Sequence, residues 1–120
     1  MSPRVRVIYR IEAGADCPAV ARGIVSSEFS GYVRPTKLDE LRLLISELVT
    51  HRIQNGVEHE TITLDLCAAP TVRCEVTDQG PPVLPDGWGR SFLDQFAGCW
   101  GVTRSREGTS TWFETETGQP

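Results

Sequence analysis

The sequence predicts an α+β fold, a two-layer sandwich in which helices cover one side of a mostly antiparallel sheet. Segments that alternate between apolar and polar residues are typical of half-buried strands, and all but the first of them come in neighbouring pairs along the chain. Two longer segments repeat apolar residues at helical spacing, which predicts amphipathic helices. Paired strands with helices on one side of them describe this two-layer architecture.

Length and composition indicate one ordinary domain. The chain has 120 residues, so we expect a single domain over 1–120 with a flexible tail from about residue 116 to 120. Its net charge of −4 weighs against nucleic-acid binding, which needs a basic face. No apolar run is long enough to span a bilayer, and the first residues lack the apolar core of a signal peptide. We therefore expect a cytoplasmic protein with no membrane association.

The first third of the chain predicts a strand followed by a helix. Residues 4–12 alternate, with Val5, Val7, Tyr9 and Ile11 on one face. Asp16 could cap the helix that follows, with a proline in its first turn. The apolar stripe expected on this helix consists of Val20, Ile24, Val25 and Phe29.

The second helix has the clearest predicted boundaries. Thr36 is expected to cap its start, with Asp39 in a capping-box-like position, and Asn55 with Gly56 to end it in a left-handed turn. Its stripe toward the core consists of Leu38, Leu41, Leu44, Ile45, Leu48 and Val49. Glu47 and His51 are expected on the flank of this stripe.

The second half of the chain predicts two strand pairs around a short helix. Strands are expected near 61–67 and 71–77, joined by a tight turn at Ala69 and Pro70. A loop over 78–89, a helix over about 90–98, and strands near 100–104 and 109–115 follow. Cys17, Cys67, Cys74 and Cys99 lack C-x-x-C spacing, so we expect free, mostly buried thiols rather than a zinc site. Whether Cys67 and Cys74 interact is left open.

Three short motifs carry the functional argument. Glu47 and His51 are four residues apart, a spacing that places both side chains on one helix face. The segments Asp78-Gln79-Gly80 and Gly87-Trp88-Gly89 contain glycines of the kind that let a backbone approach a phosphate. Each motif alone is more often a solvated pair or a turn. Their order along the chain is what gives them weight.

With these motifs the chain resembles the GHKL (Bergerat-fold) ATPase domains. Within that group it is most similar to the anti-sigma factor serine/threonine kinases of Gram-positive bacteria, especially actinobacterial ones. The segments that carry the resemblance are Ala21-Arg22, 46–50, 78–80, 87–89, 100–102 and 108–114. The resemblance covers nearly the whole chain and implies a Bergerat fold that binds ATP with Mg²⁺.

The resemblance also implies roles for individual residues. Glu47 matches the general base, and His51 stands at the position of the asparagine whose oxygen binds Mg²⁺ in the family. Asp78 matches the aspartate that accepts a hydrogen bond from the adenine amino group, and Gly80 the glycine that lets the base pack closely. A carboxylate suits that task because it only accepts hydrogen bonds.

Further positions are implied for phosphate, adenine and protein partners. Gly87 and Gly89 match the backbone contacts to phosphate, and Ser110 matches a hydroxyl near adenine. Arg22 matches an arginine used in partner contacts. The partners implied are a sigma factor and a STAS-domain antagonist, and a homodimer is possible.

Four departures from the family pattern leave two functions open. His51 offers no oxygen ligand, Pro82 replaces a flexible glycine, the lid between the two glycine segments is very short, and Arg90 stands where an apolar residue is usual. One function is an anti-sigma-factor-like regulator with weak serine kinase activity. The alternative is a binding module that keeps the fold without ATP chemistry, so the sequence leaves open whether the chain is an enzyme.

Overall fold

Strands and helices follow one another in the order that the periodicity predicts. The structure is a computed structural model that describes residues 5–56, 60–68 and 70–118. Its elements are β1 (Val5–Glu12), α1 (Cys17–Phe29), α2 (Pro35–Asn55), β2 (Thr61–Ala68), β3 (Thr71–Asp78), α3 (Gly87–Phe96), β4 (Cys99–Ser105) and β5 (Gly108–Glu116). The predicted turn at Ala69 and the end of the predicted tail, 119–120, lie outside the described residues.

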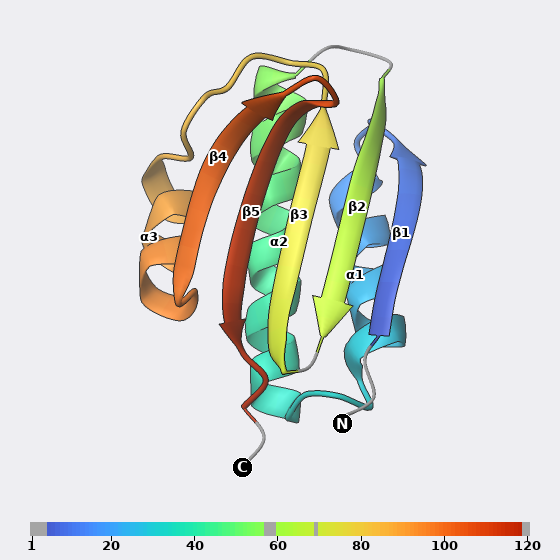
Figure 1. Cartoon of the computed structure of the whole chain (residues 1–120), viewed down its shortest axis with the longest axis vertical. Helices are drawn as coiled ribbons and strands as arrows, with labels where there is room; N and C mark the ends of the chain where they lie inside the picture. Colours follow the sequence, from blue (N-terminus) through green and yellow to red (C-terminus); the bar gives the residue numbers. More distant parts are fainter. Residues whose placement is uncertain (1–4, 57–59, 69, 119–120) are drawn as a thin grey trace.

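The strands form one sheet in the order β1-β2-β3-β5-β4, and every neighbouring pair is antiparallel. After β3 the chain passes through α3 to the outer strand β4 and returns as β5 beside β3 (Figure 1). Asp78, the last residue of β3, is therefore paired with Thr109 near the start of β5. This register brings two segments about thirty residues apart to the same corner of the sheet.

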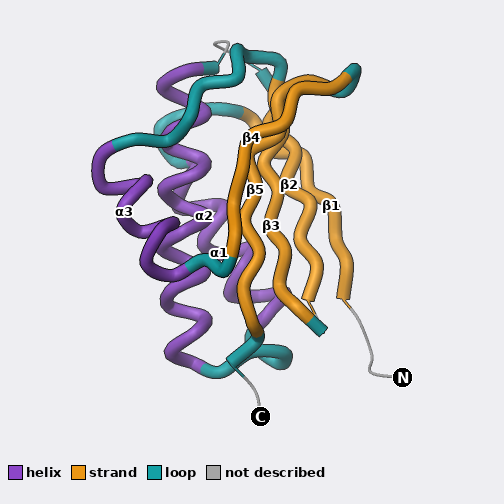
Figure 2. Tube along the Cα trace, turned by 60° about the vertical axis from the view of Figure 1, so that its left-hand side comes forward, coloured by secondary structure: helices purple, strands orange, loops and turns teal. Residues whose placement is uncertain are grey.

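All three described helices lie on one side of the sheet (Figure 2). The strands bury every second side chain against them, as the alternating burial of β2 and β3 shows. The core includes Phe29, Leu41, Leu44, Ile45, Leu48, Leu64, Leu66, Leu93 and Phe113. Burial of each such side chain stabilises the fold by about 1.5–3 kcal/mol. The predicted fold class, an α+β two-layer sandwich, is confirmed.

The stripe predicted for α1 is only partly right. Its buried residues are Cys17, Ala21, Val25 and Phe29, each four residues after the last, and Val20 is 41% exposed. Small side chains at the first two positions let α1 approach its neighbours closely, so packing selected them over the more apolar Val20. Asp16 is at the N-cap, but its side chain makes no capping hydrogen bond.

The start predicted for α2 is wrong, and its predicted end is right in position but not in conformation. The helix begins at Pro35 with Arg34 as its N-cap, so Thr36 lies inside the first turn rather than capping it. Proline is common at the first position of a helix because its fixed φ is already close to the helical value. At the other end Gly56 is extended, with φ −93°, and not left-handed. Asn55 instead donates its side-chain amide to the carbonyl of His51, which satisfies one group of the last turn.

Helix α3 begins three residues earlier than the sequence predicts, at Gly87 instead of Arg90. Gly87 has φ +57°, a left-handed conformation that glycine adopts at little cost. The Gly87-Trp88-Gly89 motif is consequently the first turn of a helix. None of the described helices is long and apolar enough to cross a membrane.

The cysteines are all free, as the sequence predicts, but their burial differs. Cys17 and Cys74 are buried, Cys67 is half-buried and Cys99 is exposed, so the expectation of burial is wrong for Cys99. Cys67 pairs across the sheet with Arg73 and Cys74 with Leu66. Since neighbouring positions of a strand point to opposite faces, Cys67 and Cys74 lie on different sides of the sheet.

Candidate functional site

The candidate site lies where the end of β3, the last turns of α2 and the start of β5 meet. Asp78 occupies this corner with 3% of its surface exposed, on the face of the sheet that α2 covers. Residues 79–86, which we call the lid segment, leave β3 here and lead to α3.

Asp78 is held by a fully buried arginine that lies outside the three sequence motifs. Arg52, on α2, is 0% exposed and donates Nε to Oδ2 of Asp78 at 2.5 Å and Nη2 to Oδ1 at 2.7 Å. This bidentate arrangement is the strongest geometry that a guanidinium and a carboxylate can form. The backbone N–H of Gly80 also donates to Oδ1, at 2.6 Å. Both oxygens of Asp78 therefore accept hydrogen bonds from within the chain.

The backbone closes tightly around this pair. A Cβ on Gly80 would lie 2.6 Å from Cα of Gly56, 2.9 Å from Oδ1 of Asp78 and 3.0 Å from Nη2 of Arg52. Such separations are well inside van der Waals contact, so the site requires glycine at position 80. Gly80 thus makes a close approach, and the groups that it approaches are Gly56, Asp78 and Arg52.

His51 is also engaged by the chain itself. Its Nε2 lies 2.7 Å from the carbonyl oxygen of Val83 in the lid segment, and its Nδ1 lies 3.2 Å from the side-chain amide nitrogen of Asn55. The amide can only donate and the carbonyl can only accept, so these partners select the neutral tautomer that carries its proton on Nε2. His51 is 9% exposed and continues the buried stripe of α2 rather than lying on its flank.

The lid segment is fastened to the body of the protein at three carbonyl groups. The carbonyl of Gly80 accepts from Oγ1 of Thr109 at 2.5 Å and from Nη1 of Arg104 at 2.9 Å. Nη1 of Arg52 donates to the carbonyl of Pro81 at 2.9 Å, and His51 holds the carbonyl of Val83. Prolines at 81, 82 and 85 restrict the backbone further.

Glu47 faces the first turn of α3. A Cβ on Gly89 would lie 3.4 Å from its Oε2. A carboxylate beside a helix N-terminus is favourable, because the helix dipole places partial positive charge there. Glu47 is half-buried and makes no hydrogen bond or ion pair within the described part of the chain. Arg90 is exposed, packs over the ring of Trp100 at 5.1 Å and pairs with Asp94 at 3.6 Å.

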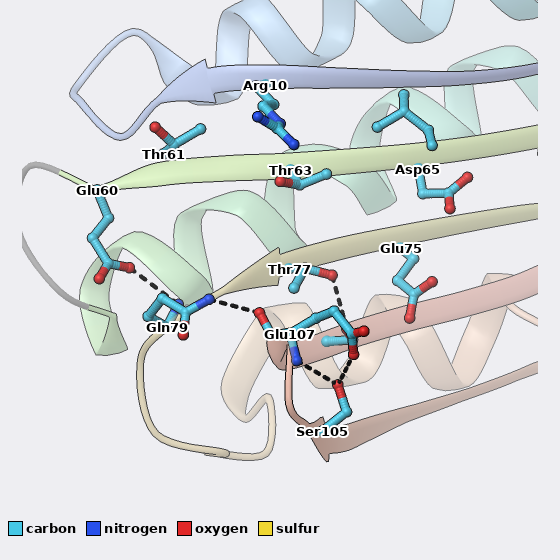
Figure 3. A pocket seen from close by; sticks show the side chains of 12 residues that line it. Arg10, Glu60, Thr61, Thr63, Asp65, Glu75, Thr77, Gln79, Ser105 and Glu107 are labelled. Carbon is cyan, nitrogen blue, oxygen red and sulfur yellow. Dashed lines mark hydrogen bonds between the residues drawn. The ribbon is translucent and has the colours of Figure 1, made fainter.

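Ser110 and Arg22 are not brought to this corner. Ser110 lies on the opposite face of the sheet, 2.8 Å from the hydroxyl of Thr77, and its neighbour Thr109 is the hydroxyl on the side of Asp78. The open face carries a hollow of about 830 Å³ that Ser110 lines with acidic and threonine side chains (Figure 3). Arg22, on α1, donates Nη1 to the hydroxyl of Ser46 on α2 at 2.9 Å.

The residues at the corner do not fit ATP with Mg²⁺ in this arrangement. The acceptors of Asp78 are taken by Arg52, both nitrogens of His51 are engaged, and the space beside Gly80 is filled. Among the described residues no group of three or more His, Cys, Asp or Glu side chains is placed to hold a metal ion. We therefore derive no phosphoryl-transfer step for this chain.

Arg52 is the residue that sequence reasoning missed, although the sequence contains a clue to it. Leu41, Leu44, Leu48 and Arg52 recur at spacings of three and four, so Arg52 continues the stripe that faces the core. An arginine is almost never fully buried unless it is paired, so its position on the stripe calls for a buried carboxylate nearby.

Fold and site together define a class: a two-layer α+β domain with the RsbW-type fold, in which the corner that the sequence predicts to bind a nucleotide is filled by the chain's own side chains. A solved structure described as the RsbU and RsbW domains of Rv1364c from Mycobacterium tuberculosis has this fold, and the similarity is to its RsbW domain. The match has a TM-score of 0.75 at 16% identity and covers 99% of this chain and 34% of that chain. This chain thus spans about a third of that neighbour's length. The likeness confirms the predicted resemblance at the level of the fold.

Neither a protein-family model nor a curated protein sequence matches the chain.

Proposed function

We propose that this chain is an anti-sigma-factor-like regulator that binds a sigma factor, a STAS-domain antagonist, or both. The observation that carries the proposal is the RsbW-type fold, which is matched over 99% of the chain at a TM-score of 0.75. An acidic chain of net charge −4 also suits partners with basic contact surfaces.

Of the two mechanisms that the sequence leaves open, the contacts favour binding without ATP chemistry. Phosphoryl transfer depends on positioning the nucleotide and neutralising its charge with a metal. Asp78 and His51, which would serve those tasks, are committed to Arg52 and Val83. The kinase alternative keeps one supporting observation, since the carboxylate of Glu47 has no partner among the described residues.

The outward face of α1 is the surface that we assign to the partner. Val20 is 41% exposed, and a Cβ on Gly23 would meet nothing within 4 Å, so this face is open and flat. Arg22 borders it, with one guanidinium nitrogen bonded to Ser46 and the rest of the group available. A partner docked here would contact Gly23 at the centre of the face, with Val20 on one flank and Arg22 on the opposite flank, toward α2.

The test is affinity capture from the native host with the tagged chain, followed by identification of the captured proteins. Recovery of a sigma factor or a STAS-domain protein supports the proposal, and recovery of neither by a folded chain contradicts it. Gly23→Arg should abolish capture, because it places a long side chain on the face without touching the core. Gln54→Arg, which adds the same charge at an exposed position at the end of α2, should leave capture unchanged.

Arg22 needs a matched pair of variants because it also ties α1 to α2. Arg22→Ala removes the guanidinium and its bond to Ser46, whereas Ser46→Ala removes the same bond and keeps the arginine. A direct contact predicts weaker capture by Arg22→Ala only. Equal losses in both variants would assign Arg22 a purely structural role.

A further inference from the structure

We propose that Arg52 is a built-in ligand that occupies the base-binding position at Asp78 and keeps adenine nucleotides out. The proposal deepens the nucleotide-independent form of the proposed function, on which it rests for the expectation that Asp78 would otherwise meet an adenine. It predicts that removal of the guanidinium converts a closed corner into a pocket for a planar amino-heterocycle.

The first step concerns the chemistry of the competing groups. A guanidinium and an adenine edge are both planar and both present N–H donors to a carboxylate. Arg52 offers two donors and a positive charge to Asp78, whereas adenine offers one neutral amine. Charge-assisted hydrogen bonds are about twice as strong as neutral ones, and Arg52 is held in place by its own helix. Asp78 therefore binds Arg52 in preference to adenine.

The second step concerns space and burial. Arg52 and Asp78 are 0% and 3% exposed, and the backbones of Gly56 and Gly80 meet beside them. A nucleotide could reach Asp78 only if Arg52 left, and its departure would strand a buried carboxylate until the base arrived. Breaking a buried pair in this way is strongly unfavourable.

The third step links the pair to the lid segment. Nη1 of Arg52 holds the carbonyl of Pro81, so one guanidinium both occupies Asp78 and fastens the chain that would have to open. The side chains of Arg104 and Thr109 hold the neighbouring carbonyl of Gly80 but do not bond to the carboxylate of Asp78. Arg52 therefore both holds the lid segment and occupies Asp78, whereas Arg104 and Thr109 only hold the lid segment. Substitutions at Arg52 and Arg104 can separate these two effects.

The experiment compares wild type, Arg52→Ala and Arg104→Ala by isothermal titration with adenosine and with ADP, both without metal. We expect no binding to wild type at ligand concentrations up to about 1 mM, which corresponds to a Kd in the millimolar range or weaker. Arg52→Ala should bind both probes at least tenfold more tightly than wild type. Arg104→Ala, which loosens the lid segment without freeing Asp78, should behave as wild type does.

Three results would overturn the proposal: binding of adenosine by wild type with a Kd below about 100 μM, a folded Arg52→Ala that binds neither probe, or an Arg52→Ala that binds ADP but not adenosine. The last result would assign the new affinity to phosphate. If Arg52→Ala is too unstable to purify, Arg52→Gln replaces it, because its shorter side chain has no charge and offers Asp78 only a neutral amide donor, which the adenine amine can displace. A rise in the melting temperature of Arg52→Gln with adenosine then supports the proposal, and no rise contradicts it.

Capture of a sigma factor or STAS-domain protein by wild type is scored separately, so failure of the pocket and failure of the proposed function are distinguishable.

Discussion

His51 and Arg52 follow one another near the end of α2 and hold different carbonyl groups of the lid segment. His51 bonds to Val83, and Arg52 bonds to Pro81 as well as to Asp78. At the scale of single residues, the position that the sequence resemblance matched to a metal ligand is thus an anchor for the lid segment. The two side chains have different partners, so single substitutions can separate their effects.

The first prediction is that His51→Asn alone does not produce Mg²⁺-dependent ATP binding. Asparagine supplies the oxygen ligand that the family uses, but Arg52 still occupies Asp78. The substitution should instead destabilise the fold by about 1 kcal/mol, the net value of one hydrogen bond, because asparagine is too short to hold Val83. Titration with ATP at fixed Mg²⁺ and urea unfolding measure the two effects. A tenfold gain in ATP affinity would contradict the expectation.

The second prediction concerns the thiols. Partial desolvation and the hydrogen bond from its thiol to Glu114 raise the pKa of Cys99, whereas complete burial raises the pKa of Cys74 far more. Because the thiolate is the reactive form, alkylation of Cys99 should increase with pH beyond the range of an ordinary thiol. Cys74 should react only after unfolding. Mass spectrometry of iodoacetamide-treated protein at a series of pH values measures both rates.

Glu114→Gln is the control for that measurement. It removes the negative charge beside Cys99, lowers the pKa of the thiol toward its ordinary value and should speed alkylation at neutral pH. An unchanged rate would show that Glu114 does not govern this thiol.

At the scale of elements, the turn from β4 to β5 is fitted closely to the end of β3. Gly108 begins β5 with φ +127°, and a Cβ on it would lie 2.2 Å from the carbonyl oxygen of Asp78. Only glycine satisfies both the backbone conformation and the close approach. Gly23 is the opposite case, since it lies inside α1 with open space where a Cβ would project.

The third prediction compares alanine at these two glycines. Gly108→Ala should destabilise the protein by about 1–3 kcal/mol or more, because strain in the backbone adds to the clash with Asp78. Gly23→Ala should stabilise it by about 0.4–1 kcal/mol, since alanine reduces the freedom of the unfolded chain and favours a helix. Urea unfolding of both variants gives the two values. Effects of the same sign would contradict the described packing.

At the scale of the whole molecule, the two faces of the sheet have different roles. The helices and the Arg52–Asp78 corner lie on one side, and the hollow with Glu60, Asp65, Glu75 and Glu107 lies on the other (Figures 2 and 3). A ligand in that hollow would be separated from Asp78 by the thickness of the sheet. The open face is therefore on the far side of the sheet from the Asp78 corner, although Gln79 of the lid segment also lines the hollow and bonds to Glu60.

The fourth prediction is that ATP with Mg²⁺ does not stabilise the intact protein. A ligand at one hundred times its Kd would add about 2.7 kcal/mol and raise the melting temperature by several degrees. With Asp78 occupied, we expect a change of less than about 1 °C at millimolar ATP. Differential scanning calorimetry with and without nucleotide measures it. A shift of several degrees that EDTA abolishes would show an active nucleotide site.

The sequence by itself determined the elements and the fold class. Alternation in residues 61–67 and 71–77 and the stripe from Leu41 to Val49 depend on local periodicity, which a chain displays before it folds. The starts of α2 and α3 were predicted less well. A proline or a glycine can either begin a helix or lie in the loop before it, and local sequence does not distinguish the two. Tertiary packing placed Pro35 and Gly87 at the starts of their helices.

Only the tertiary structure decided what the motif residues contact. Periodicity placed Arg52 on the buried stripe, but its partner Asp78 is 26 residues away in the sequence, and it is the sheet and helix packing that brings the two together. The pairing of Asp78 with Thr109 likewise depends on β5 returning beside β3. A motif fixes the type of residue at a position, whereas the neighbours that satisfy a buried charge are set by long-range packing. For this reason Asp78, matched by sequence to an adenine-binding position, is found in the structure to be the partner of a buried arginine.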